Sequence, residues 1–280
     1  MPRYVYLNNK YINYKDAYIH IEDRGFQFSD SVYEVIKVIK KKILDYDFHV
    51  RRLKYSTKEL NFNFKLDKKK LYKIFINLIK KNKLNNGTIY LQVTRGVQNR
   101  EHAYNKNLKP NIIIYTNYKN FNLPNKNYKG FKAITYPDIR WARPDIKTTS
   151  LLANILAATY ASNKGAYEAI FFKGNIITEA AHSNVWIIKK NKIITHPANK
   201  EILKGVTRTV LIKIIYSNGL ILKEKKFTKK ELYNADEVFI TSSGSLITPI
   251  IQVDSCKINN GKIGTITKTL ALNLYKSIIK

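Results

Sequence analysis

The chain has 280 residues and a single cysteine, Cys256, which excludes an intramolecular disulfide. No uninterrupted apolar stretch reaches the roughly 18 to 20 residues that cross a bilayer, and the first residues lack the charged-then-apolar layout of a signal peptide. We therefore expect a soluble, cytoplasmic protein with no membrane partner. The length fits one large domain or two modest ones, and two is our starting expectation.

The formal net charge of +30 suggests nucleic-acid binding, because a basic surface binds polyanions with release of counterions. However, nine of the 50 basic residues are arginine, which leaves 41 lysines spread over every segment. Lys, Asn, Ile and Tyr are abundant together, as in proteins encoded by AT-rich genes. We interpret the charge as compositional drift and expect no specific nucleic-acid partner.

The first 116 residues predict a mixture of strands and helices, which indicates an α+β domain. The predicted strands are residues 3–7, 11–21, 31–39, 88–94 and 111–116. Helical spacing covers residues 50–60 and again extends from Asp67, a predicted N-cap, to about residue 83.

Residues 117–130 are rich in Asn and Lys, contain Pro124 and show no periodicity, which predicts a linker. The chain should therefore divide near residue 120, into a small α/β domain of residues 1–119 and a larger domain of residues 120–280.

Strands dominate the second half of the chain, with helices between them. The predicted strands are residues 131–136, 138–146, 169–172, 175–178, 185–188 and 192–195, with two more flanking residues 241–244. Helices are predicted to start after Thr149 or Ser150, after Gly205, near Thr228, and at about residue 265.

Lys147 stands between the predicted strand 138–146 and the helix start at residues 148–150, which would direct its side chain into a cleft. A lysine that forms a Schiff base has to be a free amine near neutral pH, which desolvation or a neighbouring positive charge provides. Position alone separates Lys147 only slightly from the other lysines, most of which are solvated surface charges.

Several blocks in register distinguish this lysine. They are Glu22-Asp23-Arg24-Gly25, Val32-Tyr33-Glu34-Val35, Val93-Thr94-Arg95-Gly96, Asp138-Ile139-Arg140-Trp141, Asp145-Ile146-Lys147, Thr195-His196-Pro197-Ala198-Asn199, Leu203-Lys204-Gly205 and Thr248-Pro249. Over essentially the whole chain they resemble the class IV aminotransferases, which use pyridoxal 5'-phosphate (PLP). The resemblance implies the α+β fold of type IV PLP enzymes: a small α/β domain, a larger α/β domain with a pseudo-barrel sheet, the cofactor between them, and a homodimer that completes each site.

The resemblance also implies the cofactor-binding residues, and no metal ion. PLP would be bound to Lys147 as an imine, and Glu179 would keep the pyridine nitrogen protonated. The helix start Gly205-Val206-Thr207 and a guanidinium suit the phosphate dianion. The full set implied is Lys147, Glu179, Arg52, Val206, Thr207, Ser243 in the turn Thr241-Ser242-Ser243, and Leu203 beside the ring.

The sequence departs from the family at Ala180-Ala181-His182, where small and hydroxylic residues are common. His182 either alters the hydrogen bonding near the ring or is a polar residue fitted into the cleft, and the sequence leaves both interpretations open.

By the same resemblance, Tyr33 reaches toward the cofactor and substrate, and substrate choice should depend on Arg100 and His102. In the D-amino acid branch of the family, the corresponding arginine and histidine come from the neighbouring subunit and hold the substrate α-carboxylate. Branched-chain aminotransferases generally lack this pair. The prediction is ping-pong transamination of D-amino acids, such as D-alanine and D-glutamate, with a 2-oxo acid acceptor, in which Lys147 is the general base.

Three alternatives remain. An L-branched-chain aminotransferase and an aminodeoxychorismate lyase share the lysine, the carboxylate and the phosphate-binding residues. A protein of a different class, which binds polyanions through its positive charge and has a decayed enzyme site, is the third.

Overall fold

The computed structural model describes residues 3–121, 124–125 and 128–279. The chain divides into two units, Met1–Phe121 with Ile146–Ser150, and Asn122–Asp145 with Leu151–Lys280. The segment that carries Lys147 is thus grouped with the first unit. The domain division at residue 120 stays a prediction, and residues 122, 123, 126 and 127 of the predicted linker lie outside the described residues.

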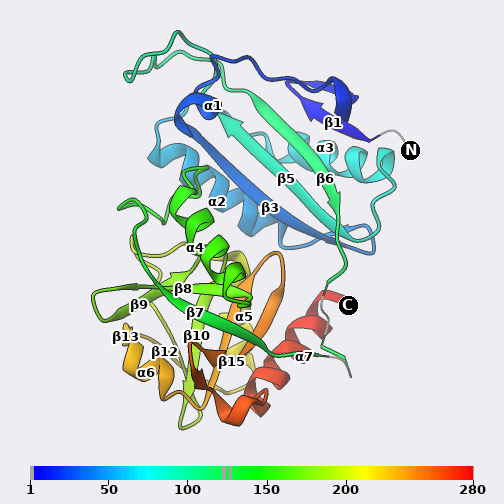
Figure 1. The fold of residues 1–280 in the computed structure, drawn as a ribbon. Helices are drawn as coiled ribbons and strands as arrows, with labels where there is room; N and C mark the ends of the chain where they lie inside the picture. Colours follow the sequence, from blue (N-terminus) through cyan, green and yellow to red (C-terminus); the bar gives the residue numbers. More distant parts are fainter. Residues whose placement is uncertain (1–2, 122–123, 126–127, 280) are drawn as a thin grey trace. The chain divides into compact units, whose positions relative to one another are not determined.

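The first unit is built on an antiparallel sheet of strand order β2-β1-β6-β5-β3-β4. The strands are β1 (Tyr4–Leu7), β2 (Lys10–Asn13), β3 (Ser31–Ile39), β4 (Lys42–Ile43), β5 (Gly87–Thr94) and β6 (Ile112–Tyr118). The helices are α1 (Arg24–Phe28), α2 (Tyr46–Glu59) and α3 (Lys68–Lys81), and α2 and α3 cover one face of the sheet (Figure 1).

Alternation along β3 explains the two faces of this sheet. Val32 and Ile36 belong to the core that includes Leu53 of α2 and Phe75 of α3. The side chain of Tyr33 lies on the opposite face, where aromatic rings stack across the strands.

The predicted strands and helices of the first unit are observed, with bounds shifted by a few residues, except for one strand; α1 and β4 were not predicted. Asp67 caps α3 as expected, by accepting a hydrogen bond from the backbone N–H of Lys70. The strand predicted for residues 11–21 is wrong beyond Asn13: a 3-10 helix, η1 (Tyr14–Asp16), follows β2. The segment after it is largely exposed and pairs with no strand, so its alternating pattern has no buried face to form.

The second unit is built on a curled sheet of strand order β12-β11-β10-β14-β15-β7-β8-β9-β13, with β16 paired to β15. Its strands are β7 (Phe131–Pro137), β8 (Glu168–Lys173), β9 (Ile176–Ala180), β10 (Asn184–Lys189), β11 (Lys192–Thr195), β12 (Ile221–Glu224), β13 (Phe227–Thr228), β14 (Glu237–Ser242), β15 (Leu246–Val253) and β16 (Cys256–Lys257). Its helices are α4 (Leu152–Asn163), α5 (Val206–Ser217), α6 (Lys229–Tyr233), the 3-10 helix η2 (Asn259–Gly261) and α7 (Thr265–Ile279).

Strand β10 shows how the sheet is packed on both sides. Val185 and Ile187 join an interior cluster that takes residues from β7 through β15. Trp186 and Ile188 point the other way, into the core shared with α5 and α7. The predicted α+β class with a pseudo-barrel in the larger unit is confirmed. Within the described ranges, no helix is both long and apolar enough to span a membrane.

Two predictions around Lys147 are wrong. Residues 138–146 form a loop, because Pro144 offers no N–H to a ladder and the charged side chains pair locally, Arg140 with Asp138 and Arg143 with Asp145. Neither Thr149 nor Ser150 caps α4, whose N-cap is Leu151. The Thr149 hydroxyl instead donates to the carbonyl of Ser29. By contrast, Gly205 precedes α5 and Thr228 forms a capping box for α6, as expected.

A buried ion pair joins α2 to β3. The Arg52 guanidinium donates from Nε and a terminal nitrogen to the two oxygens of Glu34, at 2.8 and 2.7 Å, and Nδ1 of His49 lies 2.7 Å from Glu34 Oε2. Burial by itself would raise the pKa of Glu34, but the Arg52 charge and the hydrogen bonds outweigh it and lower the pKa from 4.5 to about 2. Burial also lowers the pKa of His49, although its contact with Glu34 opposes this.

We predict that this ion pair makes the protein less stable as the pH falls. A carboxyl whose pKa is lowered by folding stabilises the protein above its unfolded pKa and loses that contribution as the pH falls toward the folded value. Between about pH 5 and about pH 2, the unfolding free energy should therefore fall, with Glu34 accounting for up to about 3 kcal/mol of the loss. When the unfolding free energy is measured by urea unfolding at several pH values, Glu34→Gln should lack this fall with pH. The exposed control Glu101→Gln should keep it. If the unfolding free energy of Glu34→Gln fell with pH as much as that of the unmodified protein, the prediction would be contradicted.

Candidate active site

Lys147 is held against the start of β3 in the first unit. Its backbone N–H donates to Ser56 Oγ at 3.1 Å, and its carbonyl accepts from the N–H of Tyr33 at 3.0 Å. Thr148 bridges to Val32. The backbone is thus fixed on both sides of the lysine, and its Nζ lies 4.1 Å from the centroid of the Tyr33 ring.

Tyr33 belongs to a row of stacked rings on the face of the first sheet opposite α2 and α3. Its ring stacks on Tyr90 with 5.7 Å between centroids, and Tyr90 lies 4.9 Å from Tyr115. The neighbouring rings restrict the motion of the Tyr33 side chain, which helps to fix the distance between its ring and the Lys147 amine.

Arg100 and His102 lie on the exposed loop after β5, and Phe28 brings them together. The guanidinium of Arg100 lies 5.0 Å from the Phe28 ring centroid, and the His102 ring lies 5.6 Å from it. A guanidinium and an imidazole are thus gathered around one aromatic ring in the first unit, and both can donate hydrogen bonds to a carboxylate.

Arg24 shapes this loop and was assigned no role from the sequence. Its guanidinium donates to the carbonyls of Glu101 and His102, at 2.6 and 3.0 Å, and to Asp30 at 2.9 Å. The same group lies over the Phe28 ring. Arg24 therefore positions the main chain that carries Arg100 and His102, and its place in a recognised block was the available signal.

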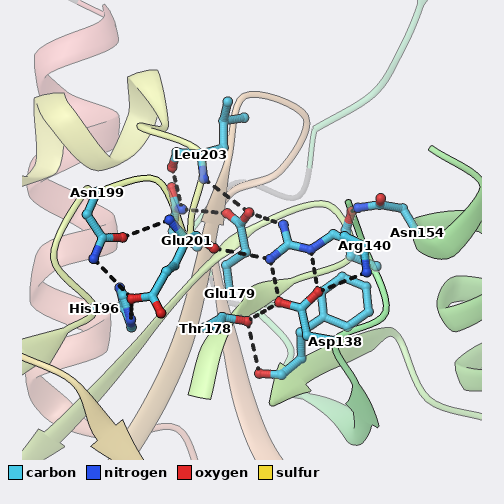
Figure 2. A network of polar contacts seen from close by, with 12 residues as sticks. Asp138, Arg140, Asn154, Thr178, Glu179, His196, Asn199, Glu201 and Leu203 are labelled. Atoms are coloured by element: carbon cyan, nitrogen blue, oxygen red, sulfur yellow. Dashed lines mark hydrogen bonds and ion pairs between the residues drawn. The ribbon is translucent and has the colours of Figure 1, made fainter. Parts of the chain in front are cut away.

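Glu179 is the centre of a polar network in the second unit (Figure 2). It is 4% exposed near the end of β9. Its Oε1 accepts from the backbone N–H of Leu203 at 3.1 Å and from Arg140, and its Oε2 accepts from Asn184 Nδ2 at 3.0 Å. Arg140 also binds both oxygens of Asp138, at 2.8 and 2.7 Å, and Thr178 donates to Asp138.

Burial sets the electrostatics of this network. Desolvation raises the pKa of Glu179, although the Arg140 charge works against it. For Asp138, which is less buried, the hydrogen bonds and charge of Arg140 outweigh desolvation, and its pKa is lowered. Because Asp138 shares Arg140, the guanidinium does not neutralise Glu179 alone, and Glu179 is suited to a further positively charged partner.

The start of α5 lies beside the same network. Asn184 Nδ2 donates to the carbonyl of Leu203 at 2.9 Å as well as to Glu179. A Cβ on Gly205, the N-cap of α5, would come within 2.1 Å of Asn184 Oδ1, so only glycine allows this approach. The N–H groups of Val206 and Thr207 have no acceptor inside the helix and suit an anion.

Sheet pairing brings the Thr241-Ser242-Ser243 turn to this end of the second unit. Asn184 pairs with Thr241 across β10 and β14. Thr241 accepts a hydrogen bond from the Trp186 indole, and Ser242 bonds to Ser245. Three predicted elements, the Glu179 strand, the α5 start and this turn, therefore meet at one end of a single sheet.

His182 lies at the tip between β9 and β10. Its side chain is 65% exposed, and its Nδ1 lies 3.2 Å from Oε1 of the buried Glu168. Ser183 donates to the other oxygen of Glu168. The carboxylate orients the imidazole, and both interpretations of His182 given above remain open.

The predicted residues thus form two groups. Lys147, Tyr33, Arg52, Arg100 and His102 belong to the first unit. Glu179, Leu203, Val206, Thr207 and Ser243 belong to the second. In the part of the chain that the structure describes, no cluster of three or more His, Cys, Asp or Glu could hold a metal ion.

Known proteins match the chain over most of its length. The family model described as "Amino-transferase class IV" matches residues 31–253. D-alanine aminotransferase of Staphylococcus epidermidis is 39% identical over 276 residues, 98% of this chain and 97% of the relative. D-alanine aminotransferase of Listeria monocytogenes is 40% identical over 268 residues, 95% of this chain and 93% of the relative.

Solved structures show the fold. The branched-chain aminotransferase of Thermoproteus uzoniensis has a TM-score of 0.90 at 23% identity, covering 100% of this chain and 95% of that one. The PLP form of the branched-chain amino acid aminotransferase of Thermobaculum terrenum has a TM-score of 0.89 at 23% identity, covering 99% and 94%. The family match, the long alignments and the shared fold all indicate that this chain belongs to the class IV aminotransferases, which are PLP-dependent enzymes.

Proposed function

We propose that this aminotransferase acts on D-amino acids, with a 2-oxo acid as acceptor. The observation that carries the proposal is the placement of Arg100 and His102 together against Phe28. Relatives that are D-alanine aminotransferases, aligned over nearly the whole chain, support the same substrate class.

The residues of this chain suit PLP. We propose that Lys147 is its covalent attachment point, that Arg52 and the α5 start with Val206, Thr207 and Ser243 bind its phosphate, and that Leu203 packs beside its ring. The bidentate pair with Glu34 orients the Arg52 guanidinium, which supports this role. When bound, PLP draws electrons from the substrate α-carbon, and the buried carboxylate of Glu179 would keep its pyridine nitrogen protonated.

Proton transfer is assigned to Lys147. Released from the cofactor, its Nζ would be a free base that can take the proton from the substrate α-carbon and hold it for the 1,3-proton shift that transamination requires. Tyr33, whose ring lies 4.1 Å from this nitrogen, limits where the amine can move. Arg100 and His102 would hold the α-carboxylate, which fixes the face of the substrate presented to the base.

We further propose a homodimer in which Arg100 and His102 act in the partner's site. Exposed apolar side chains support such an assembly, because patches of this kind mark interfaces. They are Leu152, Ile155, Leu156 and Tyr160 on or near α4, and Tyr18, Ile21 and Phe26 in the first unit. A cytoplasmic location is proposed as well, where the exposed thiol of Cys256 stays reduced.

The first prediction here concerns stereochemistry. Mixed with D-alanine, the cofactor-loaded enzyme should change its visible absorption spectrum as the amino group is transferred, and L-leucine and aminodeoxychorismate should leave the spectrum unchanged. Conversion by L-leucine but not by D-alanine would refute the D-amino acid proposal and favour the branched-chain alternative.

The second concerns Glu179. Glu179→Gln should lower kcat about a hundredfold or more, because a neutral amide cannot hold the pyridine nitrogen protonated. Cofactor binding should persist. Glu201→Gln is the matched control: Glu201 contacts Arg140 only through its backbone carbonyl, so kcat should stay within about twofold. Equal losses in both variants would contradict the assigned role.

The third tests the dimer. Arg100→Ala and Lys147→Ala should each be nearly inactive alone. If Arg100 acts in the partner's site, a randomly mixed population of the two variants contains hybrid dimers with one intact site, and about a quarter of the original activity should return. No recovery, with hybrid formation verified by tagged subunits, would place Arg100 in its own subunit's site.

A further inference from the structure

A cavity of about 410 Å³ in the second unit lies outside both groups of candidate active-site residues. Six of its eleven lining residues are lysines: Lys189, Lys190, Lys192, Lys223, Lys225 and Lys230. Lysine makes up only about a seventh of the chain, so composition alone would place one or two here. The enrichment is local and is not explained by the general excess of lysine.

Strand pairing explains why these side chains share one face. Lys189 of β10 lies directly opposite Lys192 of β11, and Ile187 lies opposite Ile194. Lys223 of β12 pairs with Ile194. Because side chains alternate along each strand, these residues project to the same side of the sheet. Lys189 and Lys192 lie directly opposite each other, where like charges repel, so the sheet concentrates positive charge on this side.

Most of this charge is not balanced by the protein. Lys189 pairs with Asp236 at 2.7 Å and Lys225 with Glu231 at 2.9 Å. For Lys190, Lys192, Lys223 and Lys230, no ion pair is present among residues 3–121, 124–125 and 128–279. Four lysines without an ion-pair partner among these residues thus line a cavity that is also lined by the buried Ile187 and Ile194.

We propose that this cavity binds a small polyphosphate group, either as inorganic triphosphate or as part of a nucleoside triphosphate. Several linked phosphates match four clustered cations, and the volume lies in the range of small-ligand sites. The site belongs to the same chain as the proposed aminotransferase activity but does not depend on it.

The test is calorimetric titration of the cofactor-loaded enzyme, so that the cofactor's own phosphate-binding residues are already occupied. ATP and inorganic triphosphate are titrated separately. The expected result is one saturable site per chain that weakens as salt is raised. Tighter binding of ATP identifies the nucleotide as the ligand, and equal binding identifies the phosphate chain alone.

A charge-matched pair of variants separates the cavity from the overall charge. The triple variant Lys192→Gln, Lys223→Gln and Lys230→Gln should weaken binding at least about tenfold. The control with Lys10→Gln, Lys54→Gln and Lys268→Gln, all exposed, should bind within about twofold of the unmodified protein. Absence of saturable binding, or equal loss in both triple variants, would overturn the proposal. Both triple variants should still transaminate D-alanine, which verifies that they fold. Polyphosphate binding and D-amino acid transamination are thus measured separately, and either proposal can fail without the other.

Discussion

Buried carboxylates paired with arginines are the constraint on which both units depend. A buried charge is tolerated only when it is paired and hydrogen-bonded. Glu34 meets this condition through Arg52, and Glu179 meets it through Arg140, Asn184 and the Leu203 N–H. In each case, the partners that make burial possible also fix the orientation of a group expected to contact the cofactor. Stability and function therefore use the same contacts.

Much of the fold could be predicted from the sequence, because periodicity and caps are local. The α3 cap at Asp67 and the α6 cap at Thr228 are of this kind. The loop at residues 138–146 was predicted as a strand although Pro144 argues against one. The local pairing of Arg140 with Asp138 and of Arg143 with Asp145, which also favours the loop, is seen only in the structure. Asp138 and Asn184 escaped notice although their partners, Arg140 and Glu179, lie only two and five residues away. Spacing alone does not show which side chains in a loop or at a strand end turn toward each other.

Arginine and lysine occupy different kinds of site in this very basic chain. Six of the nine arginines take part in ion pairs with carboxylates, namely Arg24, Arg52, Arg95, Arg140, Arg143 and Arg208. The lysines in ion pairs keep about half of their side-chain surface exposed. The planar guanidinium binds carboxylates through two parallel bonds, which an ammonium cannot do. Compositional drift toward lysine would thus be tolerated on the surface but not at these positions.

The close contact of Gly205 with Asn184 has a mechanical consequence. One amide group bonds to Glu179 and to Leu203, and its oxygen leaves no room for a side chain at the start of α5. A shift of the helix start would push Asn184 and so disturb the carboxylate behind it. Within the second unit, the start of α5 and the buried carboxylate of Glu179 are thus coupled through Asn184, and the spacing between them is set when the chain folds.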